Sequence, residues 1–126
     1  MKYEKDISII IPYKPDGGYR DKNWSWIKNR HNCIMPYAQI CIGYDNSEPF
    51  SKSSAVNKAT ESASGNILII ADADIVFDPV QIENSLDMLS QYAWISPFIN
   101  RIELNEDDSK KLINLEPGVN IKSIEF

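Results

Sequence analysis

Two aspartates that follow an apolar run are the residues of this chain best suited to chemistry. Asp72 and Asp74 come directly after Ile67–Ala71 and are separated only by Ala73. Because side chains alternate along an extended segment, both carboxylates emerge on one side while Ala73 turns to the other. Two like charges this close are costly unless a cation compensates them. The pair predicts a metal or substrate site, and a simple turn cap in solvent is the alternative.

The sequence around these aspartates offers no complete set of metal ligands. This pattern is typical of an ion held by one or two carboxylates and completed by substrate phosphates, and Mn²⁺ and Mg²⁺ both suit such a site. The chain carries 18 acidic and 13 basic residues and a net charge of -5. This balance argues against nucleic acid as the main partner and favours recruitment of a cation if phosphates are bound.

Two further groups of candidate residues precede the aspartates. Pro12, Tyr13, Lys14 and Asp45 follow two apolar runs and offer an aromatic face, a cation and a carboxylate. Such groups suit a nucleobase, a phosphate, and a ribose or imide hydrogen, respectively. Tyr13 could equally well be a core residue, and Lys14 could equally well be a solvated charge. Their assignment therefore depends on meeting Asp72 and Asp74 at one edge of a sheet.

The segment Phe50-Ser51-Lys52 reads as the start of a helix. Free backbone N–H groups and the helix dipole favour an anion there, and Lys52 would add a positive charge. In the alternative reading, Ser51 only caps the helix and Phe50 packs against its first turn.

The elements that must position these residues alternate along the chain. Apolar runs predict strands, and helices are predicted from apolar spacing, caps and glycine stops. The expected strands are Ile7–Tyr13, Gln39–Tyr44, Ile67–Ala71 and Ala93–Ile99, and the expected helices lie at about 24–34, 51–64, 79–89 and 108–115. The order predicts an α/β domain with a mainly parallel, buried sheet whose strand C-termini share the ligand-binding edge.

Individual residues carry further expectations. Ala55, Ala59 and Ala63 form a small-residue face that lets the second helix approach the sheet closely. His31, on the apolar stripe of the first helix, is expected to be packed rather than to bind a metal. Cys33 and Cys41 are expected to be buried, reduced thiols.

The chain is expected to form one domain over residues 1–126, with a core at 1–100 and a C-terminal extension at 101–126. No apolar run approaches the roughly 20 residues that cross a bilayer. The first residues, Met1–Asp6, lack the apolar centre of a signal peptide. A cytoplasmic protein is the expectation.

With these residues placed, the sequence resembles the nucleotide-binding half of GT-A-fold glycosyltransferases, particularly family 2 enzymes and the β-1,4-galactosyltransferase and chondroitin-polymerase type. The resemblance covers roughly Ile7 to Ile99. The motifs that carry it are Pro12-Tyr13-Lys14, Asp45, Phe50-Ser51-Lys52 with Asn57, Ser64-Gly65-Asn66, and Asp72-Ala73-Asp74.

The resemblance implies a minimal, Rossmann-like GT-A sandwich that transfers a sugar from a UDP-sugar to a hydroxyl acceptor with Mn²⁺ or Mg²⁺. The residues at 12–14 and Asp45 would hold uracil and ribose, and Phe50 and Lys52 would flank the nucleotide. Asp72 would contact ribose or metal, and Asp74 would be the metal ligand proper.

Two departures from the family pattern keep an alternative open. Lys52 stands where the family usually has arginine, so a point charge replaces a bidentate fork. The chain also reaches Phe126 before the family's second acidic motif, so no catalytic base is identified. The alternative is a non-catalytic UDP-sugar-binding module that works with a partner chain or a second copy of itself.

A phosphatase of the haloacid dehalogenase type is less favoured. The run Asp72–Val76 fits its nucleophile pattern loosely, but that motif ends the first strand of its fold, whereas two strand–helix units precede it here. The glycines Gly17 and Gly18 form neither a P-loop nor a dinucleotide fingerprint.

Overall fold

Strand β1 (Ile7–Tyr13) is the centre of the sheet. In the computed structural model, which describes residues 1–126, every residue of β1 is buried. It pairs in parallel with β2 (Gln39–Tyr44) on one side and with β3 (Ile67–Ile70) on the other, giving the order β2-β1-β3. A central parallel strand covered on both faces must be apolar throughout, as this one is. The predicted α/β fold with a parallel sheet is confirmed.

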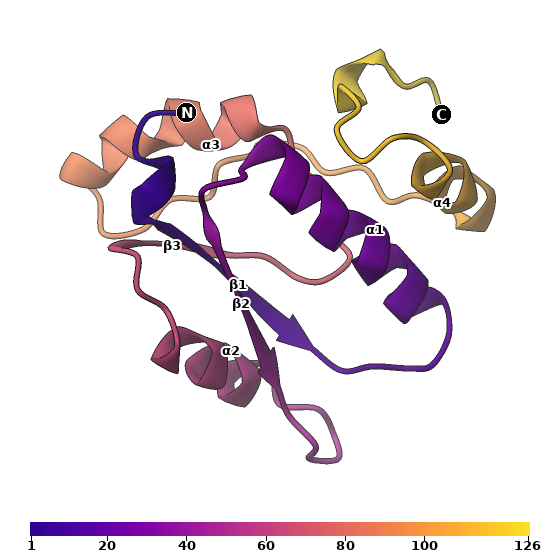
Figure 1. Cartoon of the computed structure of the whole chain (residues 1–126), viewed down its shortest axis with the longest axis horizontal. Helices are drawn as coiled ribbons and strands as arrows, with labels where there is room; N and C mark the ends of the chain where they lie inside the picture. Colours follow the sequence, from indigo (N-terminus) through magenta and orange to yellow (C-terminus); the bar gives the residue numbers. More distant parts are fainter.

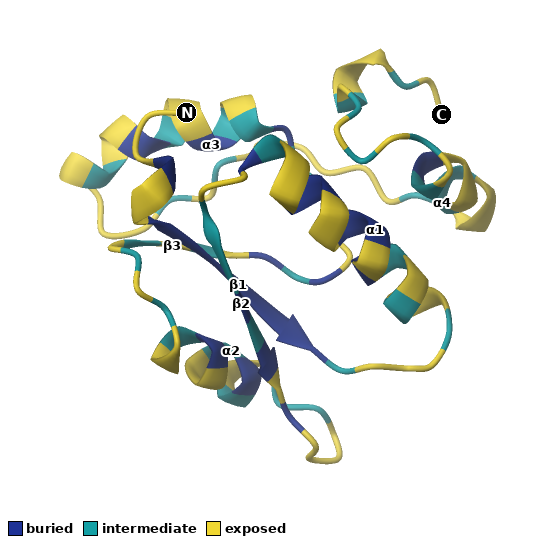
Figure 2. Ribbon diagram, in the orientation of Figure 1, coloured by how far each residue is buried: buried dark blue, intermediate teal, exposed yellow.

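Helices cover the two faces of the sheet. Helix α1 (Tyr19–Ile34) lies on one side and α2 (Lys52–Glu61) on the other (Figure 1). Alternate residues of β1 divide between them: Ile9 belongs to the main core with Trp24 of α1, and Ile10 to a smaller core on the α2 side. Figure 2 shows buried residues along β1 and on the inward stripe of α1.

Helix α2 lies very close to the sheet, and the prediction of a small-residue face is confirmed for Ala55 and Ala59, both fully buried. The predicted end near Ser64 is too late, because the helix ends at Glu61 and Ala63 lies beyond it. Gly65 lies beyond the end of the helix and has another role. A Cβ there would lie 2.5 Å from the carbonyl oxygen of Asp6, so this glycine permits close passage of two backbone segments.

The third strand departs from the expectation of a strand buried on both faces. β3 is an edge strand, and Leu68 and Ile70 are exposed on one face. Both residues pair with β1 residues that face α2, but α2 packs mainly against β1 and β2. Leu68 and Ile70 are apolar, as is typical of a strand in such a sheet. They are exposed because α2 does not cover this face of β3.

The predicted strand Ala93–Ile99 is wrong. Helix α3 (Pro79–Leu86) and the 3-10 turn η2 (Asp87–Ser90) are followed by an irregular segment, in which Trp94 is 79% and Ile99 97% exposed. A strand needs a neighbour to take its hydrogen bonds, and none pairs with this segment.

The C-terminal part packs back onto α1. It contains α4 (Glu106–Ile113), close to the predicted 108–115, and the 3-10 turn η3 (Ile121–Ser123). The indole N–H of Trp26 donates to the carbonyl of Leu115 at 2.9 Å. A further 3-10 turn, η1 (Glu4–Asp6), precedes β1. None of the helices is long and apolar enough to span a membrane.

The predictions for His31 and the cysteines have mixed outcomes. His31 is 1% exposed and its ring stacks on Phe77 with the centroids 5.3 Å apart, so the packed histidine is confirmed. Cys41 is buried and free as expected. Cys33 is free but exposed, because it lies on the outer face of α1.

Candidate functional site

The carboxyl ends of the three strands meet at one edge of the sheet. Tyr13, the last residue of β1, is in register with Tyr44 at the end of β2. On the other side, the N–H of Ala71 donates to the carbonyl of Ile10, which extends the pairing just beyond β3. The chain leaves β1 toward β2 through α1 and reaches β3 through α2 on the opposite face. The edge between β1 and β3 is thus a switch point of the kind where open α/β sheets bind ligands.

The segment after β3 directs two carboxylates away from the core. Ala71 and Ala73 are buried in the main core, whereas the Asp72 side chain is half-buried and Asp74 is exposed. Burial therefore alternates along Asp72-Ala73-Asp74 as predicted, although Ala73 and Asp74 lie in a turn and not in an extended strand. A turn begins there, with the N–H of Ile75 donating to the carbonyl of Asp72 at 3.2 Å.

Lys52 contacts one of these carboxylates. Ser51 caps α2 by accepting a hydrogen bond from the N–H of Ser54, as predicted, and Lys52 is the first residue of the helix. Its Nζ lies 2.7 Å from Oδ1 of Asp72, and the two side chains are 58% and 40% exposed. The structure thus brings together a residue expected beside the nucleotide and a residue expected at the metal.

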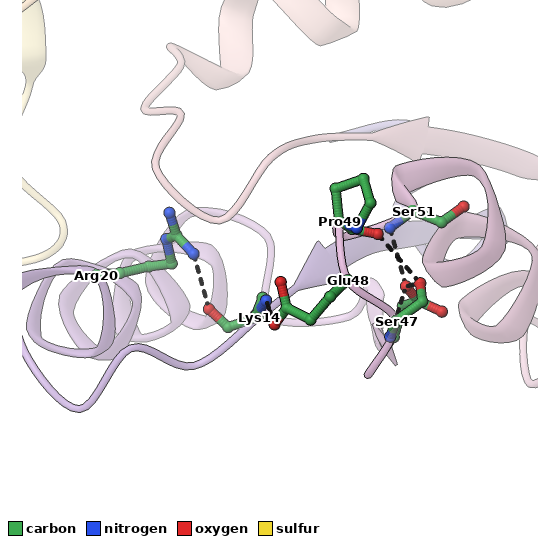
Figure 3. A network of polar contacts seen from close by, with 7 residues as sticks. Lys14, Arg20, Ser47, Glu48, Pro49 and Ser51 are labelled. Atoms are coloured by element: carbon green, nitrogen blue, oxygen red, sulfur yellow. Dashed lines mark hydrogen bonds and ion pairs between the residues drawn. The ribbon is translucent and has the colours of Figure 1, made fainter.

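The carboxylate of Asp45 organises the loop that leads into α2. It accepts hydrogen bonds from the Ser47 hydroxyl and from the Ser51 N–H at 2.9 Å, in the loop shown in Figure 3. These bonds, the Ser47 hydroxyl first, lower the pKa of Asp45 to about 2. Lys58 lies 3.6 Å from the other carboxylate oxygen. Asp45 is thus a buried anion whose Oδ2 is held by its own loop.

Lys14 joins the loops after β1 and β2. Its Nζ lies 2.5 Å from Oε1 of Glu48, and its carbonyl accepts a hydrogen bond from Arg20 (Figure 3). Glu48 was not singled out from the sequence, where it is one polar residue in a turn, 34 positions from Lys14. The pair keeps a cation at the edge of the sheet.

The loop between β1 and α1 is held by its own aspartates. The N–H of Gly17, at φ 71°, donates to Asp21, and the N–H of Gly18 donates to Asp16, both at 2.8 Å. Hydrogen bonds to these carboxylates lower the pKa of both groups.

Tyr13 and Pro12 are buried rather than open at this edge. The hydroxyl of Tyr13 donates to Asp21, and its ring packs against Trp24 at 5.9 Å and Tyr44 at 6.0 Å. Burial, and then Asp21, raise the pKa of Tyr13. Tyr44, half-exposed, is the aromatic residue that is open here. Its place directly before Asp45, at the end of a strand, is the signal that could have found it.

The oxygen donors at this edge suit a metal ion whose remaining ligands come from a bound substrate. No group of three or more histidine, cysteine or acidic side chains forms a metal site. Asp72 and Asp74 supply oxygen donors, which Mg²⁺ and Mn²⁺ prefer. The ammonium of Lys52 on Asp72 shows that the position accommodates a positive charge.

Comparison with known proteins identifies one family. The model described as "Glycosyl transferase family 2" matches residues 8–122 of the 126-residue chain. The match begins in β1 and ends in η3, so that it includes every loop of the candidate site. Neither the curated proteins nor the solved structures give a significant match.

Proposed function

The chain belongs to glycosyl transferase family 2, and we propose that it transfers a sugar from a UDP-sugar to a hydroxyl acceptor with the help of Mn²⁺ or Mg²⁺. The observation that carries this proposal is the placement of Asp72 and Asp74. Both leave the core at the carboxyl edge of a parallel sheet, and a cation already compensates Asp72. That arrangement suits recognition of a diphosphate through a shared metal ion.

The residues at this edge divide into three roles. Asp74, the more exposed aspartate, would be the metal ligand, and Asp72 would contact metal or ribose. Lys52, with Phe50 beside it, would flank the nucleotide. The bound ion would neutralise charge on the departing diphosphate.

The base and ribose would lie against the loops after β1 and β2. Pro12 and Tyr13 would support this surface from the core, and Lys14 would present its charge to the nucleotide. Asp45 would act by holding the loop at 45–51 and by directing its remaining acceptor capacity to the nucleoside.

The reaction would form a bond from the acceptor oxygen to the anomeric carbon and break the bond from that carbon to the diphosphate. The acceptor proton would pass to a base. A family 2 domain supports glycosyl transfer as the class of reaction.

The test is thermal unfolding with UDP, Mn²⁺, both or neither, in the native protein and in Asp74→Ala. A ligand at a hundredfold its dissociation constant stabilises by about 2.7 kcal/mol, which raises the midpoint by several degrees in a domain of this size. The expected shift needs both ligands and disappears in Asp74→Ala. Glu83→Ala, which removes an exposed acid from α3, should keep the shift. No shift with any combination would refute the proposal.

A second candidate function, a UDP-sugar-binding module that works with a partner chain, is favoured by the amount of exposed surface. The chain exposes 8352 Å². A compact monomer of 14.4 kDa exposes about 6,800 Å². Part of the exposed surface is apolar, on the uncovered face of β3 and at Trp94 and Ile99. Sugar transfer or UDP-sugar hydrolysis by the purified monomer would exclude this candidate, and binding without turnover would support it.

A further inference from the structure

Asp72 forms an ion pair with a cation of the protein itself. Lys52 reaches it from the first turn of α2, 20 positions earlier in the chain, with Nζ 2.7 Å from Oδ1. A lysine at the start of a helix is unfavourably placed with respect to the helix dipole. The negative charge of Asp72 therefore offsets the unfavourable interaction of Lys52 with the dipole of its own helix.

The ion pair is weak enough to exchange. Both side chains are more than a third exposed, and pairs of this kind change an equilibrium constant by at most about fivefold. The ammonium of Lys52 nevertheless reduces the negative charge that Asp72 and Asp74 together present to an incoming ion. A divalent ion arriving alone meets a partly neutralised site.

Two other lysines at this edge are also paired, but with different consequences. Lys14 pairs with Glu48 and Lys58 with Asp45. Neither of these acids belongs to the candidate metal site. Lys52 differs from these two lysines because its partner, Asp72, is a candidate metal ligand. Asp72 would have to exchange Lys52 for the metal ion when the ion binds.

We propose that Lys52 is an exchangeable counter-cation that keeps the metal affinity of Asp72 low until the donor diphosphate draws the lysine away. This inference rests on the proposed function. When the diphosphate is present, Lys52 finds negative charge on the ligand and Asp72 becomes free for the metal ion. Metal and nucleotide then strengthen each other's binding, and the coupling is reciprocal.

The experiment compares binding of Mn²⁺ alone, measured by the loss of the free-ion paramagnetic resonance signal, in the native protein and in Lys52→Met. The variant should bind Mn²⁺ alone about two- to fivefold more tightly, since it no longer loses an ion pair worth that much. In saturating Mn²⁺ it should bind UDP at least about fivefold more weakly, because a charged contact to phosphate is lost. The two affinities move in opposite directions, which loss of folding cannot produce.

Two controls separate this exchange from a general change in charge. Lys28→Met removes an exposed lysine from α1 and should leave both affinities at native values. Lys52→Arg keeps a cation on Asp72 and should keep the weak binding of Mn²⁺ alone. An unchanged thermal midpoint of Lys52→Met establishes that its fold is intact.

The outcomes distinguish this inference from the proposed function. If Lys52→Met binds Mn²⁺ alone no more tightly than the native protein, while the native protein binds Mn²⁺ with UDP, the exchange is refuted and the proposed function remains. If the native protein and Lys52→Met both fail to bind Mn²⁺ with or without UDP, the proposed function fails and the exchange fails with it.

Discussion

The backbone of Gly43 on β2 lies directly against the backbone of Ala55 on α2. A Cβ at position 43 would fall 1.8 Å from the carbonyl oxygen of Ala55 and 2.9 Å from the N atom of Ala59. The missing side chain allows the helix to approach the sheet, and Lys52 at the start of that helix lies within reach of Asp72 beyond β3. A contact between two small residues thus contributes to the geometry of the candidate site.

Gly43→Ala is expected to destabilise the protein by about 3 kcal/mol, because the new methyl group meets backbone atoms that cannot rotate away. Urea unfolding followed by circular dichroism measures the change. Gly118→Ala is the matched control, since its Cβ would meet only the Cβ of Cys33 at an ordinary 3.7 Å. Equal stabilities of the two variants would contradict the close approach of α2.

Asp45 is expected to titrate at about pH 2, as measured by carboxyl ¹³C resonance in the native protein. The Ser47 hydroxyl is the largest cause of the lowered pKa, so Ser47→Ala should raise it toward the ordinary value near 4. The folded pKa lies below the unfolded one. The stabilisation is therefore complete above about pH 4 and is lost as the pH falls through 2. A native pKa near 4 would show that the loop bonds are not formed.

His31→Phe is expected to flatten the dependence of stability on pH between about 6.5 and 4. Burial, with the neighbouring Arg30 charge, lowers the pKa of His31 to about 4, and neither ring nitrogen has a hydrogen-bond partner. The unfolded chain binds the proton more readily, so stability falls as the pH drops from 6.5 through 4, by about 3 kcal/mol.

Urea unfolding of the native protein and His31→Phe at pH 7 and pH 4 measures this difference. Acidic groups contribute equally to both proteins, so the comparison isolates the histidine. Phenylalanine can keep the stacking on Phe77, whose ring centroid lies 5.3 Å from that of His31. Parallel pH profiles for the two proteins would show that His31 is not held neutral by burial.

Arg30→Met is expected to release the C-terminal segment from α1 and to cost about 3 kcal/mol, because three carbonyls lose a charged donor. The buried guanidinium donates to the carbonyls of Pro117 at 2.9 Å, Val119 at 2.7 Å and Phe77 at 3.2 Å. Amide hydrogen exchange within 119–124 should accelerate in the variant.

Arg101→Met is the control for this prediction. Arg101 is exposed and pairs only with Glu103, so its loss should change stability by less than about 0.5 kcal/mol. Native exchange rates at 119–124 in Arg30→Met would mean that the segment is held by its apolar contacts alone.

The sequence by itself determined the elements whose signals are local. The apolar run of β1, the cap at Ser51 and the start of α3 at Pro79 each depend on neighbouring residues alone, and the structure places them as predicted. The alternation that turns Asp72 and Asp74 outward is local for the same reason. Family 2 membership was likewise anticipated from short motifs.

Only the tertiary structure decided which distant residues meet and which apolar faces are covered. The sequence marks Lys52, Asp72 and Lys14 separately, but the contacts of Lys52 with Asp72 and of Lys14 with Glu48 form only where two loops converge. Ile70 and Trp94 carry the residue types of a buried sheet, yet they are exposed because no element packs over them. Burial and pairing depend on the partner as well as on the residue, so a single stretch of sequence does not contain them.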